Sequence, residues 1–168
     1  MNNRGFTLIE LFVAIAIITT LLLIAVMDFG AMQRKAQVDR FTKELYGDLQ
    51  EARMRAAFTR QPQGVALEVN AAGNKSRAVF RRFLNEDDPA GVVTETKNYP
   101  FLFTANSSVT NIEFNTRGVM KGAVTRVICA QPNVGAPHDA LIVDQAVTNL
   151  GKWTNRGGGC ASANIAKK

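Results

Sequence analysis

The chain has 168 residues, of which 46% are hydrophobic, and its formal net charge is +6. This length suffices for one compact domain with an extended segment, but not for two domains of ordinary size. Its two cysteines, Cys129 and Cys160, have neither the C-x-x-C spacing of a redox motif nor the spacing of zinc ligands. They indicate either one disulfide in an oxidising compartment or two reduced cysteines in the core.

An apolar segment extends from Phe6 to Met27. A helix over this segment is about 33 Å long, enough to cross a hydrocarbon core of about 30 Å. A secretory signal peptide would have a shorter apolar core followed by small residues at a cleavage site, and residues 27–30 lack that pattern. Arg4 precedes the segment, so we expect the N-terminus to stay in the cytoplasm and the rest of the chain to lie outside it.

Glu10 is the one charged residue of the apolar segment. A carboxylate inside a bilayer costs a few kcal/mol, and such residues are functional candidates by default. The simpler alternative is that Glu10 lies at the membrane interface and reaches out to water.

A second helical pattern follows the apolar segment. Apolar residues recur at spacings of three and four, which predicts one buried stripe: Val38, Phe41, Leu45, Leu49, Ala52 and Ala56. Charged residues fall mostly on the other faces, and Arg40 and Glu44 are spaced to pair. We predict a single helix from near Phe6 to near Phe58, with a candidate kink at Gly30 and a second half that packs on a domain.

The remaining chain predicts short strands. We expect them over residues 64–70, 76–83, 101–104, 109–114, 124–130 and 140–144, from their apolar patterns and the turn residues between them. Turns are expected at 71–74 and 115–118, with Gly118 a candidate for positive φ, and a polar loop at 85–91. One long helix followed by short strands predicts an α+β fold with an antiparallel sheet packed on the apolar stripe.

The N-terminal sequence RGFTLIEL, Arg4 to Leu11, resembles the start of a type IV prepilin. The resemblance implies that a prepilin peptidase cleaves between Gly5 and Phe6, that Phe6 is N-methylated, and that the chain assembles into a filament with other major and minor pilins. It also implies that Glu10 meets the amino terminus of a neighbouring subunit. A positive charge nearby makes a carboxylate tolerable among apolar helices.

The rest of the chain resembles the minor pilins of the GspH/FimT group, which includes FimU-like proteins. Three stretches carry this resemblance: Leu49 to Leu67, Ile112 to Gln131, and Ala140 to Cys160. It implies the type IV pilin fold, with a leader over 1–5, a transmembrane and filament-core helix over 6–30, an amphipathic helix over 31–60 and a β-rich domain over 61–168. It also implies a last hairpin that Cys160 closes, bonded to Cys129.

The implied function is that of a minor pilin in the initiation or tip complex of a type IV pilus. Before assembly the chain would span the bacterial inner membrane with its domain in the periplasm, and afterwards it would lie in an extracellular or periplasmic filament. One alternative is a GspH-type minor pseudopilin of a type II secretion system. A second alternative is a filament-borne DNA receptor for DNA uptake.

Two positions depart from the family patterns. Met27 stands where many major pilins carry a proline, which leaves the course of the helix open. FimT-type DNA receptors carry a G-R-x-R pattern, and the matching site here reads Gly151-Lys152-Trp153-Thr154. The candidate DNA-binding residues are Lys152, Trp153, Arg156, Lys167 and Lys168. The alternative is that Trp153 anchors the last hairpin in the core while the basic residues are solvated.

Catalytic chemistry has little support in the sequence. His138 is the single histidine, so no metal site or nucleophile–histidine pair can be built around a second one. Glu86, Asp87 and Asp88 are consecutive and lack a calcium-loop pattern, which favours a solvated acidic loop. We expect no enzyme activity, no metal and no cofactor.

Overall fold

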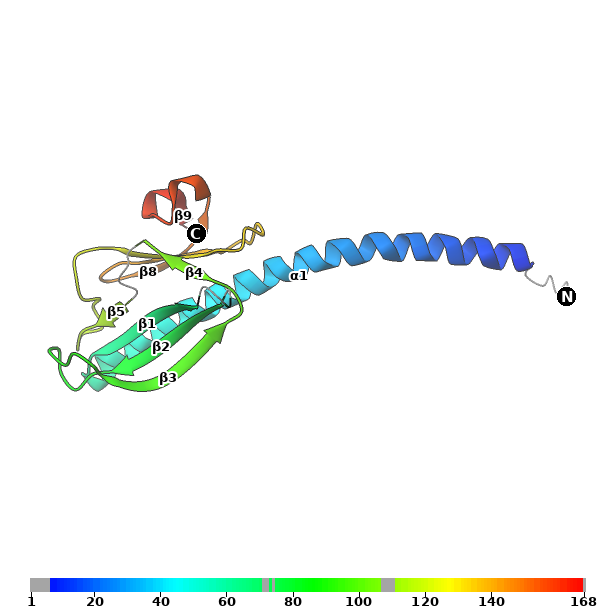
Figure 1. Cartoon of the computed structure of the whole chain (residues 1–168). Coiled ribbons are helices and arrows are strands. Elements are labelled where there is room, and N and C mark those ends of the chain that lie inside the picture. The colour runs from blue at the N-terminus through cyan, green and yellow to red at the C-terminus, as the bar shows by residue number, and fades with distance from the viewer. Residues whose placement is uncertain (1–6, 71–72, 74, 107–110, 168) are drawn as a thin grey trace.

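The computed structural model describes residues 7–70, 73, 75–106 and 111–167, and within these ranges the side chains of residues 24–28 and 70 are not described. A single long helix extends away from a β-rich domain (Figure 1). The helix is α1 (Leu8–Thr59). The described strands and short helices are β1 (Gln63–Asn70), β2 (Lys75–Arg82), β3 (Val92–Tyr99), β4 (Phe103–Ala105), β5 (Asn111–Phe114), β6 (Arg126–Ala130), β7 (Ala140–Val143), β8 (Thr148–Trp153), η2 (Arg156–Gly158), η3 (Ser162–Asn164) and β9 (Ile165–Lys167).

Helix α1 runs unbroken through Gly30 and curves gently (Figure 1). The course of the helix at Gly30, which the sequence left open, is thus continuous, because a glycine keeps its backbone N–H and only a proline would remove a hydrogen bond from the helix. The helix ends at Arg60, whose φ of 51° is left-handed. The predicted pair of Arg40 and Glu44 does not form, since the Arg40 guanidinium lies over the Phe41 ring at 5.7 Å.

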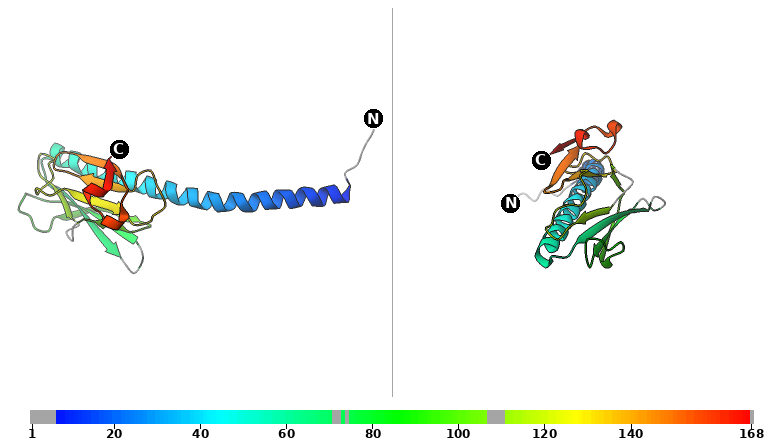
Figure 2. Two further views of the ribbon diagram at one scale, coloured as in Figure 1. Left: turned by 90° about the horizontal axis from the view of Figure 1, so that it is seen from above. Right: turned by 90° about the vertical axis from the view of Figure 1, so that its left-hand side faces the viewer.

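The strands form two antiparallel sheets. The first has the order β3-β2-β1-β5 and the second has the order β4-β6-β7-β8-β9. The expected α+β architecture is confirmed, with two sheets in place of one. Both sheets pack on the C-terminal half of α1, and the final segment of the chain lies on the outer side of the second sheet (Figure 2).

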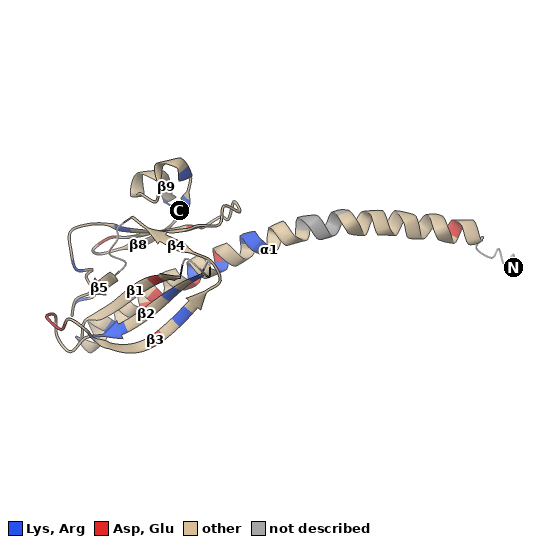
Figure 3. Cartoon of the chain, viewed as in Figure 1, with Lys and Arg blue, Asp and Glu red and all other residues tan. Residues whose placement is uncertain are grey.

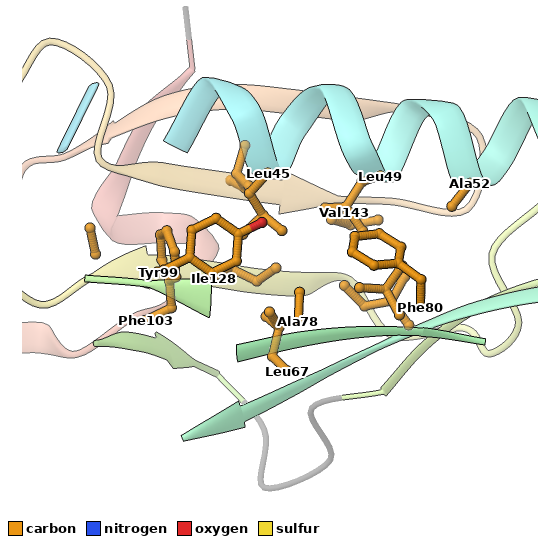
Figure 4. Close-up of a cluster of buried hydrophobic side chains, with 14 of the residues drawn as sticks. Leu45, Leu49, Ala52, Leu67, Ala78, Phe80, Tyr99, Phe103, Ile128 and Val143 are labelled. Atoms are coloured by element: carbon orange, nitrogen blue, oxygen red, sulfur yellow. The ribbon is translucent and has the colours of Figure 1, made fainter. Parts of the chain in front are cut away.

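The main core lies between α1 and the inner faces of both sheets (Figure 4). The predicted helical stripe supplies the buried residues Val38, Leu45, Leu49, Ala52 and Ala56, and Phe41 is partly buried against them. Four edge-to-face contacts order the aromatic residues at one end: Phe41–Tyr99, Phe41–Phe101, Tyr99–Phe103 and Phe101–Phe103. The stripe therefore fixes the direction in which the N-terminal half of α1 leaves the domain.

The second sheet is buried on its outer face as well. Alternate residues of β6 and β7 point there and form a second cluster with residues near the C-terminus: Val127, Cys129, Ala140, Ile142, Trp153 and Ile165. This explains why all four residues of β7 are buried. We call residues 154–167, which cover this face, the C-terminal strap.

Candidate functional site

The N-terminal half of α1 is an apolar rod, and no other described part of the single chain packs against it. Its large apolar side chains from Leu8 to Leu23 are 50–72% exposed. At about 25 cal/mol per Å² of apolar surface, leaving such a rod in water is strongly unfavourable. Within the residues whose side chains are described, no helix combines the length and apolarity needed to cross a membrane.

Glu10 has a definite local role at the start of this rod. Its carboxylate oxygen Oε2 accepts hydrogen bonds from the backbone N–H and the hydroxyl of Thr7, both at 2.9 Å. The Thr7 hydroxyl in turn accepts a hydrogen bond from the backbone N–H of Glu10 at 3.3 Å, which completes a capping box. This capping role was not predicted, although threonine followed three residues later by glutamate is a sequence signal for a capping box.

The predicted processing site falls on Gly5 and Phe6, which lie outside the described residues. The described chain begins at Thr7, directly before the first residue of α1. Lys168 likewise lies outside the described part of the chain.

Arg53 joins the helix to the second sheet. Its guanidinium donates hydrogen bonds to the carbonyl oxygens of Gln145 and Asp144 at 2.9 and 3.0 Å, and to the Thr148 hydroxyl at 3.2 Å. It also lies over the Phe114 ring at 4.9 Å. Burial lowers the pKa of Arg53, and the charge of Asp144 acts in the opposite direction. These contacts fasten the C-terminal half of α1 to the second sheet.

Gly118 is required beside Arg53. Its φ is +74°, as the sequence predicted, and a Cβ there would lie 2.8 Å from the Arg53 carbonyl oxygen. A side chain at this turn would therefore push the turn away from the helix.

The C-terminal strap is held by a disulfide between Cys129 of β6 and Cys160. The two Cα atoms are 5.9 Å apart, within the usual range for a disulfide. Cys129 is fully buried in the outer cluster, and Cys160 packs against that cluster. The bond therefore fastens the strap across the outer face of the second sheet.

Trp153 and Arg156 form the other attachment of the strap. The backbone N–H of Trp153 and the Arg156 guanidinium both donate to the buried Asp139 carboxylate, at 2.6 and 2.8 Å. Arg156 also donates to the carbonyl oxygens of Ala130, Gln131 and Pro132 and lies over the Trp153 ring at 4.5 Å. Trp153 is 8% exposed. These contacts support the alternative in which Trp153 anchors the last hairpin.

Gly151, the first residue of the FimT-like pattern, has a packing role. A Cβ at Gly151 would lie 2.3 Å from the Ile165 side chain of β9. Lys152 and Lys167 lie on the neighbouring strands β8 and β9, where Lys152 is half-buried and Lys167 is exposed. The structure therefore separates the predicted DNA-binding set into two solvent-accessible lysines and two residues engaged inside the domain.

His138 and the acidic loop also have structural partners. The backbone N–H of His138 donates to Asp39 Oδ1 at 3.2 Å, and its ring Nδ1 lies 2.7 Å from the same oxygen. In the acidic loop, the Asp88 carboxylate accepts from the backbone N–H groups of Leu84, Ala90 and Gly91, and these bonds lower the pKa of Asp88. No group of residues that could hold a metal ion occurs among the residues described.

Comparisons with known proteins agree with this geometry. Residues 1–26 match the family described as the prokaryotic N-terminal methylation motif. A crystal structure of the type IV minor pilin FimU from Pseudomonas aeruginosa strain PAO1 superposes with a TM-score of 0.53 at 15% identity, over 78% of this chain and 97% of that one. FimU in a second crystal form gives a TM-score of 0.46 at 20% identity, over 72% of this chain and 94% of that one. No curated protein matches.

The chain thus has the type IV pilin fold, a long helix packed on antiparallel sheet. The prokaryotic N-terminal methylation motif covers the start of the chain, residues 1–26.

Proposed function

We propose that this chain is a minor pilin, a structural subunit of a type IV pilus that belongs to the complex that initiates the filament or forms its tip. The observation that carries the proposal is the apolar rod from Leu8 to Leu23, which is exposed in the single chain and belongs to the same unbroken helix as the residues buried in the domain core. Before assembly the rod anchors the chain in the inner membrane, and in the filament the helices of other major and minor pilins cover it. The rod then moves from the bilayer to the bundle of pilin helices. Because both environments are apolar, the transfer is reversible.

Glu10 directs the docking of the rod. Both hydrogen bonds from Thr7 end on Oε2, and within the described residues Oε1 accepts none. In our proposal, Oε1 receives the amino terminus that prepilin peptidase creates at Phe6 of a neighbouring subunit. The cost of burying an unpaired carboxylate, several kcal/mol, then disfavours every register that lacks this contact.

Three variants distinguish the proposed docking role of Glu10 from its role in capping the helix. Each is produced beside the wild-type chain in the native host, and its amount in sheared filaments is compared with its amount in the membrane. Glu10→Ala and Glu10→Gln remove the charge and are expected to be depleted from filaments. Thr7→Ala removes the cap, keeps the charge, and is expected to remain. Incorporation of Glu10→Gln at the wild-type level would exclude a charge contact at this position.

The pseudopilin alternative uses the same assembly chemistry. A minor pseudopilin would carry the same rod and the same carboxylate. The two hypotheses therefore differ only in the apparatus that assembles the chain, a type IV pilus or a type II secretion system. Deletion of the gene tests this: loss of surface pili supports the pilus assignment, whereas loss of exported enzymes with intact pili supports type II secretion.

The DNA-receptor alternative has to rest on Lys152 and Lys167 among the described residues. A fragment that begins at Gln33, titrated with labelled DNA at two salt concentrations, would show binding that weakens steeply with salt. Lys152→Ala with Lys167→Ala should then reduce the salt slope by about 1–2. Arg156→Ala is unsuitable as a test because it removes the partner of the buried Asp139 carboxylate.

A further inference from the structure

One helix face outside the core combines charge with a groove. It lies on α1 between the apolar rod and the domain, where Figure 3 shows basic residues along the helix. The groove is lined by Gly30, Gln33, Arg34, Ala36, Gln37, Arg40 and Phe41. At about 100° per residue, the two arginines fall on opposite borders of this face and the two glutamines between them. Arg34 and Arg40 are exposed, and across the described chain neither forms an ion pair.

We propose that this groove binds the phosphate of an anionic phospholipid headgroup while the chain is anchored in the membrane. The proposal rests on the proposed function, because it requires the apolar rod to lie in a bilayer before assembly. We call residues Gln33, Arg34, Gln37 and Arg40 the headgroup groove.

The position along the helix suits a headgroup. Exposed apolar side chains continue to Phe29 and Met32, which are 62% and 70% exposed. Arg34 lies about 3 Å further along the axis and Arg40 about 12 Å further. The polar layer on each side of a bilayer is about 5–7 Å thick, so Arg34 lies within it and Arg40 lies about 5 Å beyond it, a gap that its long side chain can bridge. With Met32 placed at the edge of the hydrocarbon core, the groove begins in the headgroup layer.

The direction of the side chains brings both arginines closer still. In an α-helix the Cα–Cβ bonds lean toward the N-terminus, which here is the membrane end. Arg34 and Arg40 thus extend their guanidinium groups toward the lipid. A guanidinium donates two parallel hydrogen bonds to phosphate oxygens, and the amides of Gln33 and Gln37 add donors between them.

Of the neighbouring charges, Asp39 and Lys43 are engaged with each other, whereas Glu44 lies one turn beyond Arg40 on the same face and forms no ion pair among the described residues. Lys43 pairs with Asp39 at 2.6 Å, and Asp39 also accepts from His138. Lys35 lies on another face of α1, with its side chain beside the loop that contains Gly135. Among the four residues on either side of Arg34 there is no acid, so its charge is uncompensated, whereas Glu44 offsets part of the charge of Arg40.

The test uses the full chain in nanodiscs that contain equal amounts of phosphatidylglycerol and phosphatidylcholine. Native mass spectrometry then counts the lipids retained by the released protein. The wild-type chain is expected to retain phosphatidylglycerol in preference to phosphatidylcholine. Arg34→Gln with Arg40→Gln should reduce this preference several-fold. Arg34→Lys with Arg40→Lys keeps the charge but loses the two parallel hydrogen bonds of each guanidinium. It should give an intermediate preference for phosphatidylglycerol.

Arg82→Gln with Arg117→Gln is the matched control, because both arginines are exposed on the domain, away from the groove, and the net charge falls equally. The proposal is overturned if the groove variant retains phosphatidylglycerol like wild type. Displacement of the lipid by inorganic phosphate at equal concentration would assign the groove to a free anion and also overturn it. A groove variant that retains lipid like wild type but is depleted from filaments would show that the groove contacts a neighbouring subunit and not a headgroup. A chain absent from the membrane fraction would contradict the proposed function, whereas an anchored chain without lipid preference contradicts only the groove.

Discussion

Arg53→Met removes the contact by which α1 holds the turn between β7 and β8. The substitution deletes three hydrogen bonds, two to backbone carbonyls and one to the Thr148 hydroxyl, together with the contact over the Phe114 ring. Methionine retains most of the aliphatic packing, so the change isolates the guanidinium group.

The magnitude follows from these contacts. Hydrogen bonds of this kind contribute about 1 kcal/mol each, and the contact with the ring adds about 1 kcal/mol. Part of this sum is offset, because the buried Nε of Arg53 has no hydrogen-bond partner and the group is desolvated. We expect a net loss of about 2–3 kcal/mol in the free energy of unfolding.

Arg55 provides an internal control two residues along the same helix. Its guanidinium pairs with Glu51 at 2.5 Å, and both side chains are more than half exposed. Such surface pairs contribute about 0.3–0.5 kcal/mol, so Arg55→Met should change stability little. Urea unfolding of a fragment that begins at Gln33, followed by tryptophan fluorescence of Trp153, measures both variants. Equal destabilisation by the two substitutions would refute the assignment of Arg53 as the link between helix and second sheet.

Three further outcomes follow from the structure. Reduction of the disulfide, or Cys129→Ser with Cys160→Ser, should lower the free energy of unfolding by about 3–4 kcal/mol, and unchanged urea midpoints would contradict a stabilising bond. Burial acts to raise the pKa of Asp39, but hydrogen bonds from Lys43 and His138 outweigh it and hold this pKa below its usual value. Asp39 therefore stabilises the fold above about pH 4, and this contribution is lost as the pH falls through its lowered pKa. Thermal melts from about pH 5 to about pH 2.5 should show a smaller fall in melting temperature for Asp39→Asn than for wild type. Glu10→Ala should leave the unfolding midpoint of the domain unchanged, because Glu10 lies about 40 Å along the helix from the first buried residue, Val38. A shifted midpoint would contradict this and show that Glu10 contributes to the stability of the domain.

The parts of the fold with strong periodicity were predictable from sequence. The spacing of Val38, Leu45 and Leu49 gave both the helix and the face that it buries. Strands β1 and β2 were expected within about one residue of their observed bounds, because their apolar residues are bounded by turn residues in the sequence. The positive φ at Gly118 followed from turn composition.

The sequence analysis missed features that depend on position in a sheet. Strand β3 reads as a polar segment, since its residues from Val92 to Thr96 are exposed at the edge of the first sheet. The pattern also gave no sign that the second sheet would be buried on both faces, because the strap that covers the outer face comes from far along the chain. For the same reason Arg156 was taken as a DNA-binding candidate or a solvated residue, although its ion-pair partner Asp139 lies only 17 residues earlier in the sequence.

The most direct test of the central claim is the intact mass of this subunit in filaments sheared from the native host. The account predicts a chain that begins at Phe6, carries one added methyl group, and contains the disulfide between Cys129 and Cys160. A host without active prepilin peptidase should show the longer chain in the membrane and none in filaments. A filament-borne chain that keeps residues 1–5 in the presence of active peptidase, or a chain cleaved after Met27, would contradict assembly through the N-terminal helix.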